Sequence, residues 1–188
     1  MDITDIIRAG RYFHDAGLVT AASGNLSIRC GDRLLITCTG SVLRNLCESD
    51  IVTTGIDADD DNTKRASSEL AVHREIYRRT AVKTIAHAHP LHSTALSMKE
   101  REIVPVSPEV LAVTGIVPVL GWGMEIRPGG LADIIAGALK SNPIVMVRGH
   151  GTFAAADTLD EACRCTVLFE DDCRIHRPAK PEEMVHFG

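Results

Sequence analysis

Two histidines, His87 and His89, stand two residues apart at the end of an apolar segment that stops at Pro90. Residues 82–89 are rich in apolar and β-branched side chains, which is typical of a buried strand. Residues i and i+2 of a strand project from the same face of a sheet, so both imidazoles point to one side. This geometry suits two ligands of one divalent metal ion, although a His-x-His pair by itself is more often an ordinary packed or surface pair.

Two further residues strengthen the metal interpretation. His150 lies in Arg-Gly-His-Gly, directly after residues 143–147, a second buried-strand pattern whose glycines let the backbone turn sharply. Glu69 is expected at the start of a helix, where the positive end of the helix dipole favours the ionised carboxylate. Three histidines, a free coordination position and a nearby carboxylate are the composition of a catalytic zinc site rather than a structural one.

The elements that must position these residues alternate between helices and strands. The helix that carries Glu69 is predicted to open at Ser67 or Ser68, because a serine hydroxyl caps free N–H groups of a first turn. Leu70, Ile76 and Tyr77 give this helix an apolar stripe. Further helices are expected at residues 2–16, 90–98, 131–139 and 158–175. Strands are expected at residues 26–29, 33–37, 51–54, 82–89, 143–147 and 152–156. Strands in pairs between helices predict a mixed sheet covered by helices.

Length and composition restrict the class of protein. The 188 residues predict one domain, residues 1–188, with a short polar tail from about Pro178. The net charge of −5 argues against nucleic acid as a partner. We expect no signal peptide and no membrane association, since neither a basic leader nor a long apolar run is present. Six scattered cysteines without a Cys-x-x-Cys pair predict reduced thiols and a cytoplasmic location.

Two loops of small and polar residues have the composition of an oxyanion-binding backbone. Residues 19–27 surround a glycine, and Thr39-Gly-Ser (residues 39–41) directly follows a predicted strand. The first loop, taken alone, is better interpreted as a plain turn. No Gly-x-Gly-x-x-Gly or Walker-type loop is present, which argues against dinucleotide or nucleotide binding.

Five short motifs together resemble the class II aldolase/adducin family, in particular the L-fuculose-1-phosphate aldolases. The motifs are Ser-Gly-Asn-Leu-Ser (residues 23–27), Thr-Gly-Ser (39–41), Ser-Ser-Glu (67–69), His-Ala-His (87–89) and Gly-His-Gly (149–151). Each motif is weak by itself. Five of them in the family's order, over roughly residues 6–176, are highly specific.

The resemblance implies a three-layer α/β/α fold around a mainly antiparallel central sheet, assembled as a homotetramer with active sites at subunit interfaces. It implies one Zn²⁺ per subunit, or Mn²⁺ or Co²⁺ in its place, bound by His87, His89 and His150, with Glu69 as the catalytic residue. Three loops would hold a substrate phosphate through neutral N–H and O–H donors. The residues concerned are Gly24, Asn25, Thr39, Gly40, Ser67 and Ser68.

The implied reaction is cleavage of a ketose 1-phosphate to dihydroxyacetone phosphate and an aldehyde, by way of an enediolate. Zinc would act as a Lewis acid on the carbonyl and hydroxyl oxygens of the substrate. Glu69 would move the proton at the nucleophilic carbon. The expected partner is therefore a small phosphorylated sugar.

One position departs from the family pattern. Aldolases of this family protonate the leaving aldehyde oxygen with a tyrosine from a neighbouring subunit, whereas the aligned residue here is Trp122, whose indole N–H is no useful proton donor. Candidates to reach across the interface are Glu109, Trp122, Glu125 and Arg127, although Glu125 and Arg127 are better interpreted as solvated surface residues. Two alternatives therefore stay open: another metal-dependent enzyme of the same fold (a methylthioribulose-1-phosphate dehydratase, a pentulose-phosphate epimerase or a decarboxylase), and a non-catalytic adducin-like scaffold. The scaffold is disfavoured because such domains have lost the metal ligands.

Overall fold

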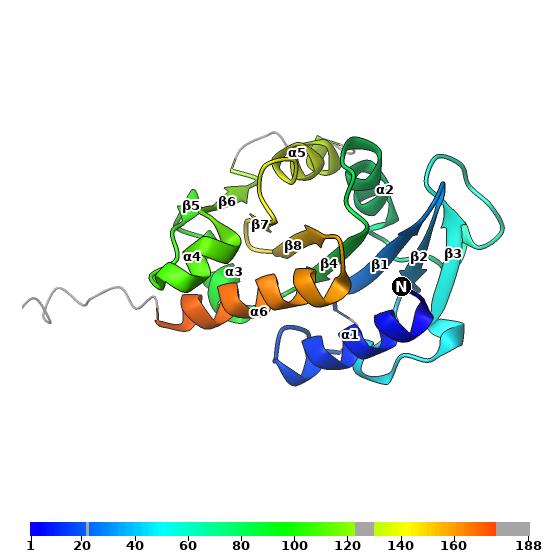
Figure 1. Ribbon diagram of the computed structural model, residues 1–188, viewed down its shortest axis with the longest axis horizontal. Coiled ribbons are helices and arrows are strands. Elements are labelled where there is room, and N and C mark those ends of the chain that lie inside the picture. Colours follow the sequence, from blue (N-terminus) through cyan, green and yellow to red (C-terminus); the bar gives the residue numbers. More distant parts are fainter. Residues whose placement is uncertain (22, 123–129, 176–188) are drawn as a thin grey trace, which may run out of the picture.

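An eight-stranded sheet runs through the middle of the computed structural model, in which residues 1–21, 23–122 and 130–175 are described (Figure 1). The strands are β1 Asn25–Cys30, β2 Arg33–Thr37, β3 Ile51–Gly55, β4 Thr84–Ala88, β5 Glu102–Ile103, β6 Val117–Leu120, β7 Ile144–Val147 and β8 Gly151–Ala156. Their order across the sheet is β3-β2-β1-β4-β8-β7-β6-β5. Neighbouring strands are antiparallel except for the parallel pair β6–β7.

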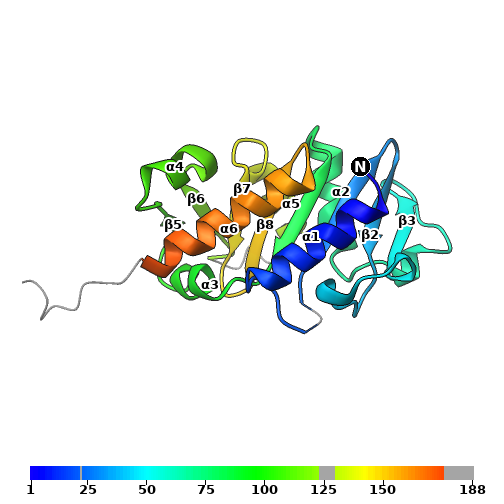
Figure 2. The ribbon, with the colours of Figure 1, turned by 60° about the horizontal axis from the view of Figure 1, so that its bottom comes forward.

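Helices cover both faces of this sheet. They are α1 Ile3–Asp15, α2 Leu70–Arg79, α3 Leu91–Ser97, α4 Pro108–Thr114, α5 Gly130–Ala138 and α6 Leu159–Ile175. Helices α1 and α6 lie on one face, and α2 and α5 lie together on the other (Figures 1 and 2). Helices α3 and α4 pack against α6. The predicted three-layer arrangement around a mainly antiparallel sheet is therefore confirmed.

The alternation of side chains along β4 decides which face each residue serves. Ile85 belongs to the apolar core under α2 and α5, whereas Ala86 and Ala88 belong to the core under α1 and α6. His87 follows the parity of Ile85, so its imidazole projects to the α2–α5 face. Every residue of β4 is buried, which agrees with the predicted buried strand.

The register of the central strands places one polar and one aromatic residue beside His87. Asn25 of β1 is its partner on one side, and Phe153 of β8 is its partner on the other. Strand β4 lies in the interior of the sheet, where both edges of the strand are fixed by hydrogen bonds. This fixes the backbone from which the first predicted metal ligand projects.

Helix α2 begins later than predicted. Its first residue is Leu70 and its N-cap is Glu69, which makes no side-chain capping bond. Ser67 is instead held to strand β2, because its N–H donates to Thr37 O at 3.0 Å. The predicted buried stripe of Leu70, Ile76 and Tyr77 is confirmed, and it also contains His73.

All six cysteines are free thiols, as predicted. Among the residues that the structure describes, no helix is both long and apolar enough to cross a membrane. The predicted polar tail from Pro178 and the candidate interface residues Glu125 and Arg127 lie outside the described residues.

Candidate metal centre and adjoining cavity

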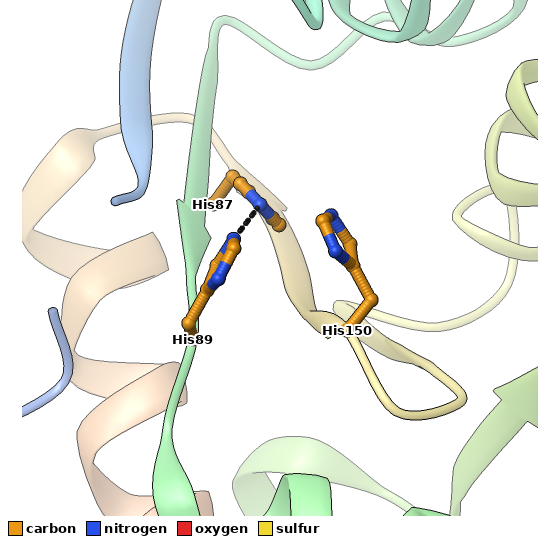
Figure 3. Close-up of side chains that lie close together, drawn as sticks. All are labelled: His87, His89 and His150. Carbon is orange, nitrogen blue, oxygen red and sulfur yellow. Dashed lines mark hydrogen bonds between the residues drawn. The ribbon is translucent and has the colours of Figure 1, made fainter. Parts of the chain in front are cut away.

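Three imidazoles meet at the end of strand β4 (Figure 3). His87 projects from the strand, His89 follows its last residue, and His150 comes from the turn between β7 and β8. The possible ligand nitrogens of the three rings all lie within 4.8 Å of one another. His87 is fully buried, whereas 40% of the His150 side chain is exposed. The cluster thus has a closed end in the sheet and an open end at the surface.

The tautomer of His87 follows from its contacts. Its Nδ1–H donates to the carbonyl oxygen of Thr152 at 2.8 Å. Burial lowers the pKa of His87 to about 3, so the ring is neutral and its Nε2 carries a bare lone pair. That lone pair lies 2.7 Å from His89 Nε2 and 3.0 Å from a carboxylate oxygen of Glu69.

Three imidazoles that converge in this way, with a carboxylate beside them, form a ligand set that a divalent cation could bind. Burial and the neighbouring His150 also lower the pKa of His89, so neutral nitrogens dominate the cluster. Neutral imidazoles are the form in which histidine binds a metal, and a backbone carbonyl on the opposite ring nitrogen is a usual support for a ligand. The three side chains therefore fit a metal ion.

Glu69 lies against the same cluster, at the N-cap of α2. Its carboxylate accepts hydrogen bonds from His150 Nε2 at 2.9 Å and from Asn25 Nδ2 at 2.7 Å. Burial raises the pKa of Glu69, but its interactions with His150, His87 and Asn25 outweigh burial and lower the pKa to about 2. These contacts favour the ionised carboxylate that the sequence predicts.

A cavity of about 160 Å³ adjoins the cluster. All six residues predicted to bind a phosphate line it, and so do Glu69, His89 and His150. The six are Gly24, Asn25, Thr39, Gly40, Ser67 and Ser68, joined in the lining by Ser23, Cys38 and Ser41. His87 lies behind this surface. Segments that are far apart in the sequence thus meet around one small polar hollow.

Close backbone approaches hold these loops in place. A Cβ atom on Gly24 would lie 2.8 Å from the carbonyl oxygen of His87, and the residue has a φ of +77°, so only glycine fits this position well. On the other side, a β-bridge joins Cys38 to Ala66, and the Thr39 hydroxyl donates to Ala66 O at 2.7 Å. These contacts explain why the 39–41 and 67–69 motifs lie side by side.

His73 is the site-related residue that the sequence reasoning missed. It is fully buried and its Nε2 bonds Asn25 Oδ1 at 2.6 Å. The signal was available, because His73 occurs at helical spacing within the apolar stripe of α2. A polar residue on a buried face must have a hydrogen-bonding partner.

Two candidate interface residues lie outside the cavity lining. Trp122 follows β6, and the guanidinium carbons of Arg101 and Arg148 lie 4.9 Å and 4.5 Å from the centroid of its ring. Glu109 lies in the exposed first turn of α4. Neither residue lines the cavity of this chain.

Comparison with known proteins agrees with this geometry. The family model described as the class II aldolase and adducin N-terminal domain matches residues 4–177. The chain is 30% identical over 176 residues to the L-fuculose phosphate aldolase of Methanocaldococcus jannaschii, with 93% of this chain and 95% of that protein covered. It is 30% identical over 173 residues to the 3,4-dihydroxyphthalate decarboxylase of Arthrobacter keyseri, with 84% and 70% covered.

A solved structure is similar over nearly its whole length. The L-fuculose-1-phosphate aldolase of Thermus thermophilus superposes with a TM-score of 0.85 at 30% identity. The match covers 92% of this chain and 90% of that one. The layers, the sheet and the loops around the cavity thus belong to one common fold.

Proposed function

The chain belongs to the class II aldolase and adducin family, and on that premise we propose that it is a zinc-dependent aldolase. The proposed reaction cleaves a ketose 1-phosphate similar to L-fuculose 1-phosphate into dihydroxyacetone phosphate and an aldehyde, by way of an enediolate. The observation that carries this proposal is the meeting of the three-histidine cluster and Glu69 at one polar cavity.

His87, His89 and His150 would hold the metal ion. Zn²⁺ is the proposed ion because three histidines with an open position are a common catalytic zinc set, and Mn²⁺ or Co²⁺ would suit the same donors. A bound ion would supply Lewis-acid polarisation of the substrate's carbonyl and hydroxyl oxygens. The remaining steps belong to side chains of this chain.

Glu69 would carry the proton at the nucleophilic carbon. In the cleavage direction, the bond between carbons 3 and 4 breaks, its electron pair stays on carbon 3, and carbon 3 gains a proton. In the condensation direction the same carbon loses that proton. In the condensation direction the carboxylate would accept the proton from carbon 3, and in the cleavage direction Glu69 would first take up a proton from water and then give it to carbon 3.

The cavity loops would bind the phosphate. Gly24, Asn25, Thr39, Gly40, Ser67 and Ser68 offer backbone N–H groups, hydroxyls and one amide, and neither Lys nor Arg is among the described residues that line the cavity. Turns of small residues form concave sites in which several N–H groups converge on one anion. Such a site would place the ketose end of the substrate beside Glu69.

A second candidate function rests on Trp122. The sequence contains two tyrosines, of which Tyr12 is exposed on α1 and Tyr77 is buried in the core, and neither lines the cavity. The proton on the hydroxyl of carbon 4 must still leave during cleavage, so water or another group would accept it. A decarboxylase, dehydratase or epimerase would use the same metal and carboxylate with different acid and base groups, and one relative bears the name of a decarboxylase.

We further propose assembly of four copies with active sites at the interfaces. Exposed apolar side chains at and beside α4 support a contact surface there: Val104, Val106, Leu111 and Ile116 are each at least 38% exposed. The free cysteines support a reducing, cytoplasmic environment. Sedimentation equilibrium would measure the assembly, and a monomer at micromolar concentration would refute it.

A coupled assay for dihydroxyacetone phosphate tests the proposed reaction. Zinc-loaded protein is given fuculose, rhamnulose, ribulose and 5-deoxyribulose 1-phosphates, with the Glu69→Gln variant as control. Release that disappears in the variant supports the aldolase. Bound zinc without release from any of the four sugars would refute it, and decarboxylase and dehydratase substrates would then be assayed.

A further inference from the structure

A continuous line of buried polar groups ends at Glu69. Tyr77 Oη lies 2.8 Å from Ser27 Oγ, and Ser27 Oγ lies 2.6 Å from His73 Nδ1. His73 Nε2 lies 2.6 Å from Asn25 Oδ1, and Asn25 Nδ2 lies 2.7 Å from Glu69 Oε2. Ser27, His73 and Tyr77 are each 0% exposed, so no solvent competes for these bonds.

Helix and strand periodicity together build this line. Glu69, His73 and Tyr77 are four residues apart along α2, which puts them on one side of the helix. Asn25 and Ser27 are two residues apart on β1, which puts them on one face of the strand. The two series interleave, so each strand residue bonds two helix residues.

The direction of every hydrogen bond follows from the Glu69 end. Asn25 places its Nδ2 2.7 Å from Glu69 Oε2 and its Oδ1 2.6 Å from His73 Nε2, and an amide oxygen only accepts. His73 must then donate from Nε2. Burial lowers the pKa of His73 to about 4, so its ring is neutral and Nδ1 accepts from the Ser27 hydroxyl. Because the Ser27 hydroxyl donates its single proton to His73, its oxygen accepts a hydrogen bond from the Tyr77 hydroxyl. Each donor points toward Glu69.

A flipped Asn25 amide is excluded by the same reasoning. It would place Oδ1 against the Glu69 carboxylate and Nδ2 against the proton on His73 Nε2. Both contacts would then join like groups, at a cost of about 1–3 kcal/mol for each unsatisfied buried group. The Nε2–H tautomer of His73 and the orientation of Asn25 therefore match each other, and Asn25 holds one Glu69 oxygen by a hydrogen bond.

We infer that His73 is a positioning residue for Glu69, acting through Asn25, in a line of hydrogen bonds that Ser27 and Tyr77 continue. The inference rests on the proposed function of Glu69. Asn25 has two N–H groups on Nδ2, and only one is used by Glu69, so the second stays available to a ligand in the cavity that Asn25 lines. The line of bonds thus couples the orientation of the phosphate loop to that of the carboxylate.

Two substitutions at position 73 separate positioning from packing. His73→Phe keeps a ring but removes both nitrogens, and we expect kcat for dihydroxyacetone phosphate release to fall about 10–100-fold, with a smaller change in KM. His73→Gln keeps an N–H near the place of Nε2 and should recover most of that loss. An unchanged kcat in His73→Phe, or equal losses in both variants, would refute the inference.

A buried hydroxyl elsewhere provides the matched control. Thr166 is fully buried on α6 and donates only to Ala162 O of its own helix. Thr166→Val should change the midpoint of thermal unfolding and leave kcat unchanged. A fall of kcat in Thr166→Val as large as that in His73→Phe would show that general destabilisation lowers kcat, and the positioning role would be refuted.

The tautomer gives a test that needs no measurement of activity. In wild-type protein with ¹⁵N-labelled histidine, the ring signal of His73 should be that of a neutral imidazole protonated at Nε2. His73→Gln assigns the signal by its disappearance. Protonation at Nδ1 would refute the directional line even if the enzyme is an active aldolase. If His73 shows the Nε2–H tautomer but the protein acts on none of the four sugars, the proposed reaction is refuted and the directional line of hydrogen bonds is not.

Discussion

Glu69 and Glu170 are two of the carboxylates in the described structure that bond histidine, one at the cavity and one between helices. Glu69 contacts His150 and His87. Glu170 of α6 accepts from the backbone N–H and Nδ1 of His92, both at 2.8 Å. It also accepts from the N–H of Ser93 at 2.9 Å. Glu170 is 2% exposed, and these bonds place its charge at the N-terminus of α3.

The two carboxylates differ in the hydrogen-bonding groups of their neighbours. All three groups at Glu170 are donors, so the carboxylate and its neighbours satisfy one another and the contact is complete. At Glu69, the neutral His87 faces the carboxylate with a lone pair, and a cavity adjoins the cluster. An acid–histidine contact indicates chemistry when acceptors remain unsatisfied, and it indicates structure when donors and acceptors match.

Histidine substitutions should produce the largest contrast between the two regions. His150→Asn removes one of three ligands, and we expect zinc affinity to fall more than about 100-fold and catalytic activity to disappear. His92→Asn should leave both unchanged. Metal analysis after dialysis measures the first effect. Zinc at one equivalent in His150→Asn would show that the three-histidine assignment is wrong.

The same pair can be compared by thermal unfolding with and without zinc. Zinc at 100 times its Kd should stabilise wild-type protein by about 2.7 kcal/mol, because the unfolded chain lacks the assembled site. His92→Asn should keep this gain and His150→Asn should lose it. Equal gains in both variants would mean that zinc binds elsewhere.

The next largest difference is expected in kcat when each of the two carboxylates is replaced by an amide. Glu69→Gln keeps the shape of the side chain but removes the base, and we expect kcat to fall about 10²–10⁴-fold. Glu170→Gln should keep kcat per folded molecule, because Glu170 is not among the residues that line the cavity. Steady-state kinetics measures kcat of both variants, with the concentration of active sites taken from the amount of bound zinc. Similar losses in the two variants would remove the distinction drawn between the regions.

The free energy of unfolding should show the opposite order, with the larger loss in Glu170→Gln. In Glu170→Gln an amide group must face a backbone N–H that a carboxylate oxygen now accepts, so one donor is left unpaired. We expect the free energy of unfolding to fall by about 1–3 kcal/mol. Urea denaturation measures it. An unchanged unfolding midpoint would indicate that the N-terminus of α3 needs no buried acid.

How far the sequence predicts these two regions depends on whether the signal is local. Strand parity gave the common side of His87 and His89, and the glycines around His150 gave the turn, because both are properties of neighbouring residues. The helix start at Ser67 or Ser68 was wrong because Ser67 is bonded to Thr37, a residue from a distant strand. No local pattern contains that bond.

The contacts of Glu170 and His73 could not be predicted for the same reason. Glu170 is one acid among several on α6, and its role depends on α3, 77 and 78 residues away in sequence. The partners of His73 lie on β1, 46 and 48 residues away. The family motifs brought the cavity residues together in advance, since the resemblance carries non-local information that periodicity lacks.

A smaller effect, the pH dependence of stability, can isolate His73 within the Glu69 region. Burial lowers its pKa from 6.5 to about 4, although the charge of Glu69 opposes this shift. Between these pH values the unfolded chain binds a proton that the folded chain does not. Stability is therefore fully present above pH 6.5 and is lost as the pH falls toward 4, at up to about 1.4 kcal/mol per pH unit for this one group.

His73→Gln removes that contribution and leaves those of His87 and Glu69 in place. The free energy of unfolding, measured by urea between about pH 4.5 and 7.5 with a chelator present, should fall less steeply with acid in the variant. The two curves should run parallel above pH 6.5, where His73 is neutral in both states, and separate below it. Curves that stay parallel down to the lowest pH would mean that His73 is protonated in the folded protein. Its ring would then donate from both nitrogens, and the one-way line of hydrogen bonds toward Glu69 would be broken at Ser27.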